Sequence, residues 1–477
     1  MERIKADICV IGAGSAGLSV AAGAAQMGAR TVLVEKAVRN GAMGGDCLHT
    51  GCVPSKALLA AAGHAQAMRS GDAFGVAAVQ PAIDFARVHD HVQGVIASIA
   101  PMDSVARFEG LGVTVIQDHA RFTGERLLVA GDREIQARRF VIATGSRAAM
   151  PPIPGLAETP VYTNETIFDL TECPKHLIVI GGGPIGMEMA QAHRRLGAEV
   201  TVIEGARVLG RDDPELAAIV ADNLRREGVT LIEEARVLRV SGGAGAVDVA
   251  YSCDGKETSV SGSHLLVATG RTPNVEDMGL EEAGVDYTPR GVTVDDRLRT
   301  TNKKIFAIGD VAGGPQFTHV AGYHAGLVIR NALFRVPARV DHSAIPHVTY
   351  TDPELAHVGE TEAEARKHHS KISALRWHLA ENDRAQADRR TEGAIKIVID
   401  GHARVLGATI VGPHAGELIL PWVMAMQQGL KLSAMAGYVV PYPTYSEITK
   451  RVAGSYYTST LFGPRTKALV RFLSWFG

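Results

Sequence analysis

Residues 8–17 read Ile-Cys-Val-Ile-Gly-Ala-Gly-Ser-Ala-Gly, an apolar run that leads into the pattern Gly-x-Gly-x-x-Gly. The apolar run predicts a buried strand, the alanine-rich segment after it predicts a helix, and residues 31–34 predict a second strand ending at Glu35. This context indicates a dinucleotide-binding unit, because the glycines allow close approach of a pyrophosphate and the acid accepts hydrogen bonds from ribose hydroxyls. The glycines of this unit are Gly12, Gly14 and Gly17.

The same pattern recurs at 177–186, which read Leu-Ile-Val-Ile-Gly-Gly-Gly-Pro-Ile-Gly and are followed by a predicted helix and strand. The spacing from first glycine to acid is 23 residues in both copies (35 − 12 and 204 − 181). Two copies with matched spacing predict two nucleotide-binding units, each closed by an apolar strand that ends in Ala-Thr-Gly, at 143–145 and 268–270. The residues of the second unit are Gly181, Gly183, Gly186 and Glu204.

A pair of cysteines lies between the first fingerprint and its closing strand, in residues 44–56, which read Gly-Gly-Asp-Cys-Leu-His-Thr-Gly-Cys-Val-Pro-Ser-Lys. In a regular helix, residues five apart have Cα atoms roughly 8–9 Å apart, whereas a disulfide needs about 4.4–6.8 Å. Cys47 and Cys52 can therefore pair only if the segment is distorted, and Gly51 supplies the backbone freedom. The residues alone also fit two inert buried cysteines. A metal site is disfavoured, because no further Cys/His cluster lies nearby in sequence.

Length and composition limit the class of protein. The chain has 477 residues, 46% hydrophobic and 21% charged, and predicts two to four domains of an α/β enzyme. A formal net charge of −2 predicts no bulk attraction to nucleic acid or to an anionic membrane. The three other cysteines are scattered, the N-terminus has no signal-sequence pattern, and no stretch of 18 residues is apolar enough to cross a bilayer. These features predict a cytoplasmic protein.

The remaining chain adds a helical stretch over 56–108, a linker at 151–155 and an apolar strand over 305–308 that ends in Asp310. A helix is expected from about Thr318. From about residue 341 the pattern changes to strands and then helices without a glycine fingerprint, which predicts a separate domain.

These motifs, in this order and over essentially the whole chain, resemble the FAD-dependent pyridine nucleotide–disulfide oxidoreductases (class I), which include glutathione reductase, dihydrolipoamide dehydrogenase and mercuric reductase. The resemblance implies an α/β fold with two Rossmann-like, three-layer nucleotide-binding domains and a C-terminal α+β dimerisation domain. It implies FAD binding by 1–150 and 272–340, NAD(P) binding by 151–271, and homodimer formation by 341–477.

The resemblance also implies residue roles. Electrons would pass from the flavin to the disulfide through Cys52, leaving Cys47 as the exposed thiol that meets substrate and lies near positive potential. Lys56 and Glu188 match an ion pair beside the flavin. Asp310 matches the acid that holds the FAD ribitol. The N-terminus of the helix at Thr318 and His319 would stabilise negative charge on the reduced flavin. Further cofactor-binding residues are expected at Lys36, Gly45, Asp46, Ala120, Thr144, Gly145, Gly270 and Arg271.

The nucleotide choice depends on Glu204. A carboxylate at the ribose position accepts from a 2′-hydroxyl and repels a 2′-phosphate, which favours NADH. Arg207 and Arg211 lie close enough in sequence to leave NADPH as an alternative.

The chain departs from the family's disulfide reductases near its C-terminus. Where those enzymes have a histidine, followed by proline and a glutamate that orients it, this chain has Tyr442, with Pro443 and Glu447 in place. A phenol with a pKa near ~10 is a poor base at neutral pH. Mercuric reductases also have a tyrosine here, and a soft metal ion held by thiolates needs no proton shuttle. Residues 455–477, however, contain no cysteine pair like the one in the tail of such enzymes. The N-terminal metal-capture domain that some of these enzymes have is not expected here.

Three functional hypotheses follow. The first is an NAD(P)H-dependent flavoprotein reductase that passes electrons through Cys47 and Cys52 to a thiol-bound metal ion or a disulfide, with the metal as acceptor and not as a resident cofactor. The second is a dihydrolipoamide dehydrogenase-type enzyme with an altered base, for which His49 is a candidate. The third is a flavin-containing redox sensor that binds a partner.

The tail, residues 461–477, mixes cations with aromatic and aliphatic residues. We expect a terminal helix that packs on its own domain or on a dimer mate. The less favoured alternative is a short basic amphipathic helix that binds a membrane surface or a partner.

Overall fold

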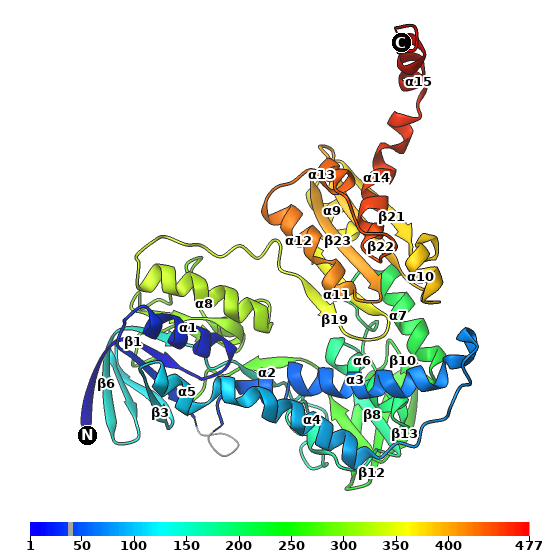
Figure 1. Ribbon diagram of the computed structural model, residues 1–477. Coiled ribbons are helices and arrows are strands. Elements are labelled where there is room, and N and C mark those ends of the chain that lie inside the picture. The colour runs from blue at the N-terminus through cyan, green and yellow to red at the C-terminus, as the bar shows by residue number, and fades with distance from the viewer. Residues whose placement is uncertain (37–41, 477) are drawn as a thin grey trace.

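The computed structural model describes residues 1–36 and 42–476 (Figure 1). The first nucleotide-binding sheet is parallel in the order β3-β2-β1-β6, with β18 also paired to β6. Its antiparallel extension through β5 and β4 completes seven strands. Helices α1 and α8 pack together against it, because the strands read as continuous apolar runs that must be covered. The bounds are β1 Glu2–Ile11, β2 Thr31–Glu35, β3 Val113–Gln117, β4 Ala120–Gly124, β5 Leu127–Ala130, β6 Arg133–Ile142, β18 Ile305–Ala307, α1 Ser15–Gln26 and α8 Thr318–Ala332.

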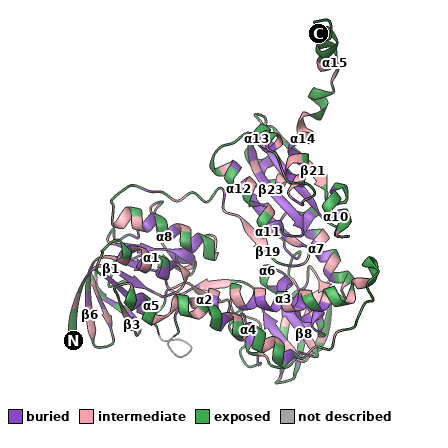
Figure 2. Cartoon of the chain, viewed as in Figure 1, coloured by how far each residue is buried: buried purple, intermediate pink, exposed green. Residues whose placement is uncertain are grey.

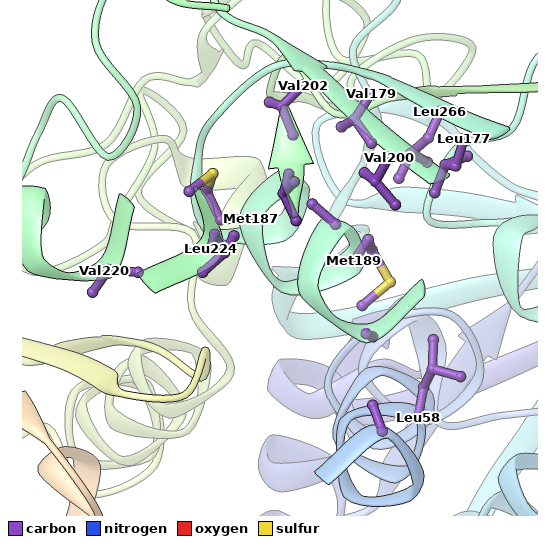
Figure 3. Packing of buried hydrophobic residues seen from close by; sticks show 14 of the residues in the cluster. Leu58, Leu177, Val179, Met187, Met189, Val200, Val202, Val220, Leu224 and Leu266 are labelled. Atoms are coloured by element: carbon purple, nitrogen blue, oxygen red, sulfur yellow. The ribbon is translucent and has the colours of Figure 1, made fainter. Parts of the chain in front are cut away.

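The second sheet is also parallel, in the order β10-β9-β8-β14, and a three-stranded antiparallel sheet, β11-β12-β13, adjoins it. Figure 3 shows part of the core here, with Met189 of α6 lying between the strands and Leu58 of α3. The bounds are β8 His176–Ile180, β9 Glu199–Ile203, β10 Val229–Ile232, β11 Arg236–Gly243, β12 Ala246–Cys253, β13 Lys256–Gly262, β14 His264–Val267, α3 Cys52–Arg69, α6 Pro184–Arg195 and α7 Pro214–Arg226.

The C-terminal part is a five-stranded antiparallel sheet in the order β19-β20-β23-β22-β21, with helices packed around the fully buried Trp422. The expectation of strands in this part of the chain is confirmed. The bounds are β19 His347–Thr349, β20 Glu354–Gly359, β21 Ile372–His378, β22 Ala394–Asp400, β23 Val405–Gly412, α9 Glu362–His368, α10 Asp383–Ala387, α11 Ala415–Leu418, α12 Leu420–Gln427, α13 Leu432–Gly437 and α14 Glu447–Leu461.

The single helical stretch expected over 56–108 is wrong in detail. It is divided into α3, α4 Phe85–Ile99 and α5 Val105–Gly110. The interruption after α3 falls where the chain contains Gly71, Gly75 and Pro81, because glycine and proline both disfavour helix continuation.

A short ribbon of β7 Ser146–Ala148 and β15 Arg271–Pro273 joins the two nucleotide-binding units. The last helix, α15 Pro464–Leu473, projects away from the C-terminal sheet (Figure 1) and has no buried residue (Figure 2). The expectation that the tail packs on its own domain is therefore wrong for α15, and packing on a mate stays a prediction. Among the described residues, no helix is both long and apolar enough to cross a membrane.

Candidate active site

The two candidate redox thiols flank a break between two helices. Cys47 lies in α2, which spans Gly45–His49, and Cys52 is the first residue of α3. The predicted distortion is confirmed at Thr50 and Gly51, where a Cβ on Gly51 would lie 2.9 Å from the Asp46 carbonyl oxygen. Both thiols are free.

The ionisation of the pair is asymmetric. The hydrogen bond from Cys47 is the largest cause that lowers the pKa of Cys52, to about 6, and Thr318 and the Lys56 ammonium lower it further. The same hydrogen bond and burial raise the pKa of Cys47. The hydrogen bond between them therefore favours the thiolate on Cys52 and the proton on Cys47.

The expectation that Cys47 is the exposed thiol at positive potential stays a prediction, since both thiols line the cavity that is expected to hold the nucleotides. Cys47 is half-buried, whereas Cys52 is exposed and has the lowered pKa. The reason is position: Cys52 begins α3, lies 3.4 Å (Sγ to Oγ1) from Thr318 at the start of α8, and borders a large cavity. A ligand that fills the cavity would cover this exposed surface.

The expected ion pair beside the thiols is present. Lys56 Nζ donates to Glu188 Oε2 at 2.8 Å, and Glu188 is buried. The Tyr350 backbone N–H donates to the other Glu188 oxygen at 2.9 Å, and the Lys56 ammonium lies 4.3 Å from the centroid of the Tyr350 ring. A residue just after β19 therefore fixes the orientation of this pair.

The first glycine turn fits a nucleotide. Gly12 has φ 104°, and a Cβ there would lie 2.4 Å from the Ala143 carbonyl oxygen. A Cβ on Gly17 would lie 1.8 Å from the Gly12 oxygen, so helix α1 can approach the strand only with glycine at this position. The Ala13 N–H donates to the Glu35 carboxylate, whose pKa is raised by burial.

The second turn repeats this geometry. A Cβ on Gly186 would lie 1.9 Å from the Gly181 oxygen, while a Cβ on Gly183 would meet nothing within 4 Å. Glu204 accepts from the Gly182 N–H at 2.6 Å and from the Ala206 N–H at 2.9 Å. In both units, the acid at the end of the second strand is thus fixed beside the glycine turn.

A polar network connects the cysteine segment to the junction of the two units. Arg271 Nη2 lies 3.0 Å from Asp46 Oδ2, and Arg271 Nε lies 3.7 Å from Asp310 Oδ2. Ser146 Oγ donates to Asp310 at 2.6 Å, and Asn164 Nδ2 donates to Asp46 at 2.8 Å. Burial raises the pKa of Asp310, while Ser146 and Arg271 oppose the rise.

Ser146 and Asn164 were missed from the sequence, because neither belongs to a local motif. Asp212 was missed too; it is buried and pairs with His347 Nε2 at 2.8 Å in the cavity wall. No sequence pattern connects these two residues, which lie 135 positions apart.

One cavity of about 2580 Å³ brings nearly all the candidates together. Gly17 and Gly186 do not line it; they pack beneath the two turns. Its lining includes Gly12, Gly14, Glu35, Lys36, Gly45, Asp46, Cys47, Cys52, Lys56, Ala120, Thr144, Gly145, Gly181, Gly183, Glu188, Glu204, Gly270, Arg271, Asp310, Thr318 and His319. Two glycine turns, each with a fixed acid, fit two nucleotides in this space, as FAD and NAD(P)H together require.

Tyr442 and Glu447 are not brought to the thiols within one chain. Neither lines the cavity, and Tyr442 is 69% exposed. Its hydroxyl donates to Asp383 at 2.9 Å, and this hydrogen bond raises the pKa of Tyr442. His49 lines the cavity, with its Nε2 2.8 Å from the Met43 carbonyl oxygen.

Comparison with known proteins agrees with this site. Residues 6–325 match the family described as pyridine nucleotide-disulphide oxidoreductase, and residues 345–453 match its dimerisation domain. The chain is 35% identical over 462 residues to a mercuric reductase of Streptomyces lividans, covering 94% of this chain and 96% of that protein. It is 34% identical over 459 residues to a dihydrolipoyl dehydrogenase of Geobacillus stearothermophilus, with the same coverage of 94% and 96%.

Among solved structures, the Cu(II) complex of the HOCl-induced flavoprotein disulfide reductase RclA from Escherichia coli is similar, with a TM-score of 0.84 and 30% identity. The similarity covers 94% of this chain and 99% of that one. The chain therefore belongs to the pyridine nucleotide–disulphide oxidoreductases, a family of FAD-dependent flavoproteins that use NAD(P)H.

Proposed function

We propose that this oxidoreductase uses NADH in preference to NADPH and passes electrons through Cys47 and Cys52 to a soft metal ion presented as a thiol complex. The observation that carries the proposal is the thiol pair itself. It opens into the cavity that both nucleotide turns line, and the lowered pKa of Cys52 favours its thiolate. Soft thiolates are the ligands that such metal ions prefer.

Bound FAD supplies the two-electron chemistry that connects the nicotinamide to the thiols. Glu35 and Glu204 lie beside the glycine turns, where they would help to hold the nucleotides. The Lys56 ammonium favours the negative charge of the Cys52 thiolate. Oxidation of one thiol and one thiolate to the disulfide releases two electrons and one proton. Two electrons reduce one mercuric ion to the metal, or two Cu(II) ions to Cu(I).

The tyrosine at position 442 supports a metal ion as the electron acceptor. Thiol–disulfide exchange needs a group that moves protons, and a phenol whose pKa is raised by Asp383 is a poor one. Relatives named mercuric reductase, and the Cu(II) complex of the RclA structure, agree with a metal acceptor.

A dihydrolipoamide dehydrogenase-type activity is the second candidate, because relatives of that name match equally well.

We also propose that Tyr442 and Glu447 act across a homodimer, since they lie away from the thiols of their own chain and within the family's dimerisation domain.

The preference for NADH over NADPH is supported by Glu204, whose carboxylate would repel a 2′-phosphate.

The test is oxidation of NADH and NADPH by the purified FAD-containing protein, with glutathione-complexed mercuric ion, Cu(II) or lipoamide as acceptor. We expect turnover with a metal ion, a higher kcat/KM for NADH, and loss of metal turnover in Cys47→Ala while reduction of the flavin by NADH persists. Cys173→Ala is the matched control. Turnover with lipoamide alone would favour the second candidate, and a Tyr442→His variant would then raise the rate.

A further inference from the structure

We propose that α15 and the residues around it form a membrane-surface anchor that binds anionic phospholipid and holds this reductase against the bilayer. The anchor is defined as residues 461–476. It lies outside the catalytic machinery, so the inference does not rest on the proposed acceptor.

The charge of the tail differs from that of the whole chain. The sequence from Ser455 to Gly477 contains Arg465, Lys467 and Arg471 and no acidic residue, although the formal net charge of the chain is −2. Unbalanced cations next to apolar side chains are the pattern of segments that bind anionic lipid surfaces, where each cation adds attraction.

Helical spacing separates most polar side chains from the apolar ones; Arg465, in the first turn, lies four residues before Leu469 and shares its face. Lys467, Arg471 and Ser474 follow one another at intervals of four and three residues, so they share one face of the helix. A different face carries four apolar residues at intervals of three, one and three: Leu469, Phe472, Leu473 and Phe476. This is an amphipathic helix with a basic polar face.

The apolar face is uncovered. No residue of α15 is buried, and the ring contacts of Phe472 are with Trp475 and Phe476 of the same tail. In α14, the buried residues end at Ala453, and α15 projects beyond that point (Figures 1 and 2). Leu461, the last residue of α14, and Phe462, in the turn before α15, are exposed as well.

A lipid surface fits this segment better than a second copy of the chain. The match to the family's dimerisation domain ends at residue 453, so the tail lies outside the segment that this family shares for dimer formation. Ten helical residues extend about 15 Å, half of the ~30 Å hydrocarbon core. The anchor therefore lies along the surface and does not span the bilayer.

The experiment uses the full-length FAD-containing protein and vesicles of phosphatidylcholine, with or without phosphatidylglycerol. We expect co-sedimentation only with phosphatidylglycerol, and binding at least about tenfold weaker in Lys467→Glu/Arg471→Glu, because each cation contributes to attraction. Phe472→Ser/Phe476→Ser should also lose binding. The matched control is Lys367→Glu/Lys371→Glu, which reverses two exposed cations of the same domain and should bind as the unmodified protein does.

Trp475 supplies an independent readout, since it is 80% exposed while Trp422 is fully buried. Anionic vesicles should shift its fluorescence to the blue and protect it from a soluble quencher, and Trp475→Phe should remove both signals. Equal binding to neutral vesicles, or no binding, overturns the proposal. If the tail variants instead change the sedimentation coefficient without lipid, the apolar face covers a second copy, which also overturns it.

Discussion

At the scale of single residues, the thiol pair behaves as a unit. Cys52 owes its pKa of about 6 first to the hydrogen bond from Cys47, and only then to Thr318 and Lys56. Each of the two sulfurs therefore influences how the other ionises.

Cys47→Ala should raise the pKa of Cys52 toward the ordinary thiol value of about 8.5. Since the thiolate exists above the pKa, the reduced protein should react with iodoacetamide at pH 7, whereas the variant should need a pH near 9. The pH dependence of the alkylation rate measures this. Cys173→Ala should leave the midpoint unchanged. An unshifted midpoint in Cys47→Ala would show that Thr318 and Lys56 alone hold the thiolate.

At the scale of elements, the second glycine turn combines glycines that the backbone needs with one that faces open space. A Cβ on Gly186 would overlap the Gly181 carbonyl oxygen, at 1.9 Å, whereas a Cβ on Gly183 has no neighbour within 4 Å. The two positions of one motif therefore serve different purposes.

Gly186→Ala should displace α6 and abolish reduction of the flavin by NADH, while the protein remains yellow because the FAD unit is separate. Gly183→Ala should keep the same unfolding temperature but raise the KM for NADH, since the new methyl group projects toward the cavity. Flavin bleaching by NADH, with dithionite as the control reductant, distinguishes the two. Reduction of Gly186→Ala at the normal rate would contradict the packing argument.

The elements that could be predicted from the sequence are those with strong local patterns. The strands before both glycine turns, the helix at Thr318 and the distortion at Gly51 were all predicted, because apolar runs and glycines act on their own neighbours. The partners Ser146 and Asn164 were not, since they approach Asp310 and Asp46 across more than a hundred residues. Which of Cys47 and Cys52 is exposed was expected only from the family resemblance, because it depends on how α8 meets α3.

At the scale of the whole molecule, buried ion clusters join the C-terminal sheet to the second nucleotide unit. Lys396, in the middle of β22, reaches Asp213 at 2.8 Å, Glu362 at 2.9 Å and Glu215 at 3.2 Å, measured from Nζ to carboxylate oxygens. Arg195 of α6 pairs with Asp352 at 3.0 Å in the same junction. These contacts position Tyr350 against Glu188, so the C-terminal part helps to complete the site.

Lys396→Met should lower the free energy of unfolding by roughly 3–5 kcal/mol, because it leaves the buried Asp213 carboxylate without its cation. Chemical denaturation measures the loss, and the exposed Lys371→Met serves as control. Lys396→Met/Asp213→Asn should regain part of the stability. If Lys396→Met were as stable as Lys371→Met, the cluster would contribute nothing to holding the domains together.

The break at Thr50 and Gly51 has an electrochemical consequence. Because the helix restarts there, Cys52 is the first residue of the 18-residue helix α3, where aligned peptide dipoles place about half a positive charge. Helix α8 begins beside Cys52, because its first residue, Thr318, has its Oγ1 3.4 Å from the Cys52 sulfur. Two helix N-termini thus favour the thiolate over the disulfide, and stabilising the reduced form makes a dithiol pair a stronger oxidant. The break between α2 and α3, which lets the two sulfurs approach, therefore also raises the reduction potential of the Cys47–Cys52 disulfide. The disulfide then accepts electrons more readily.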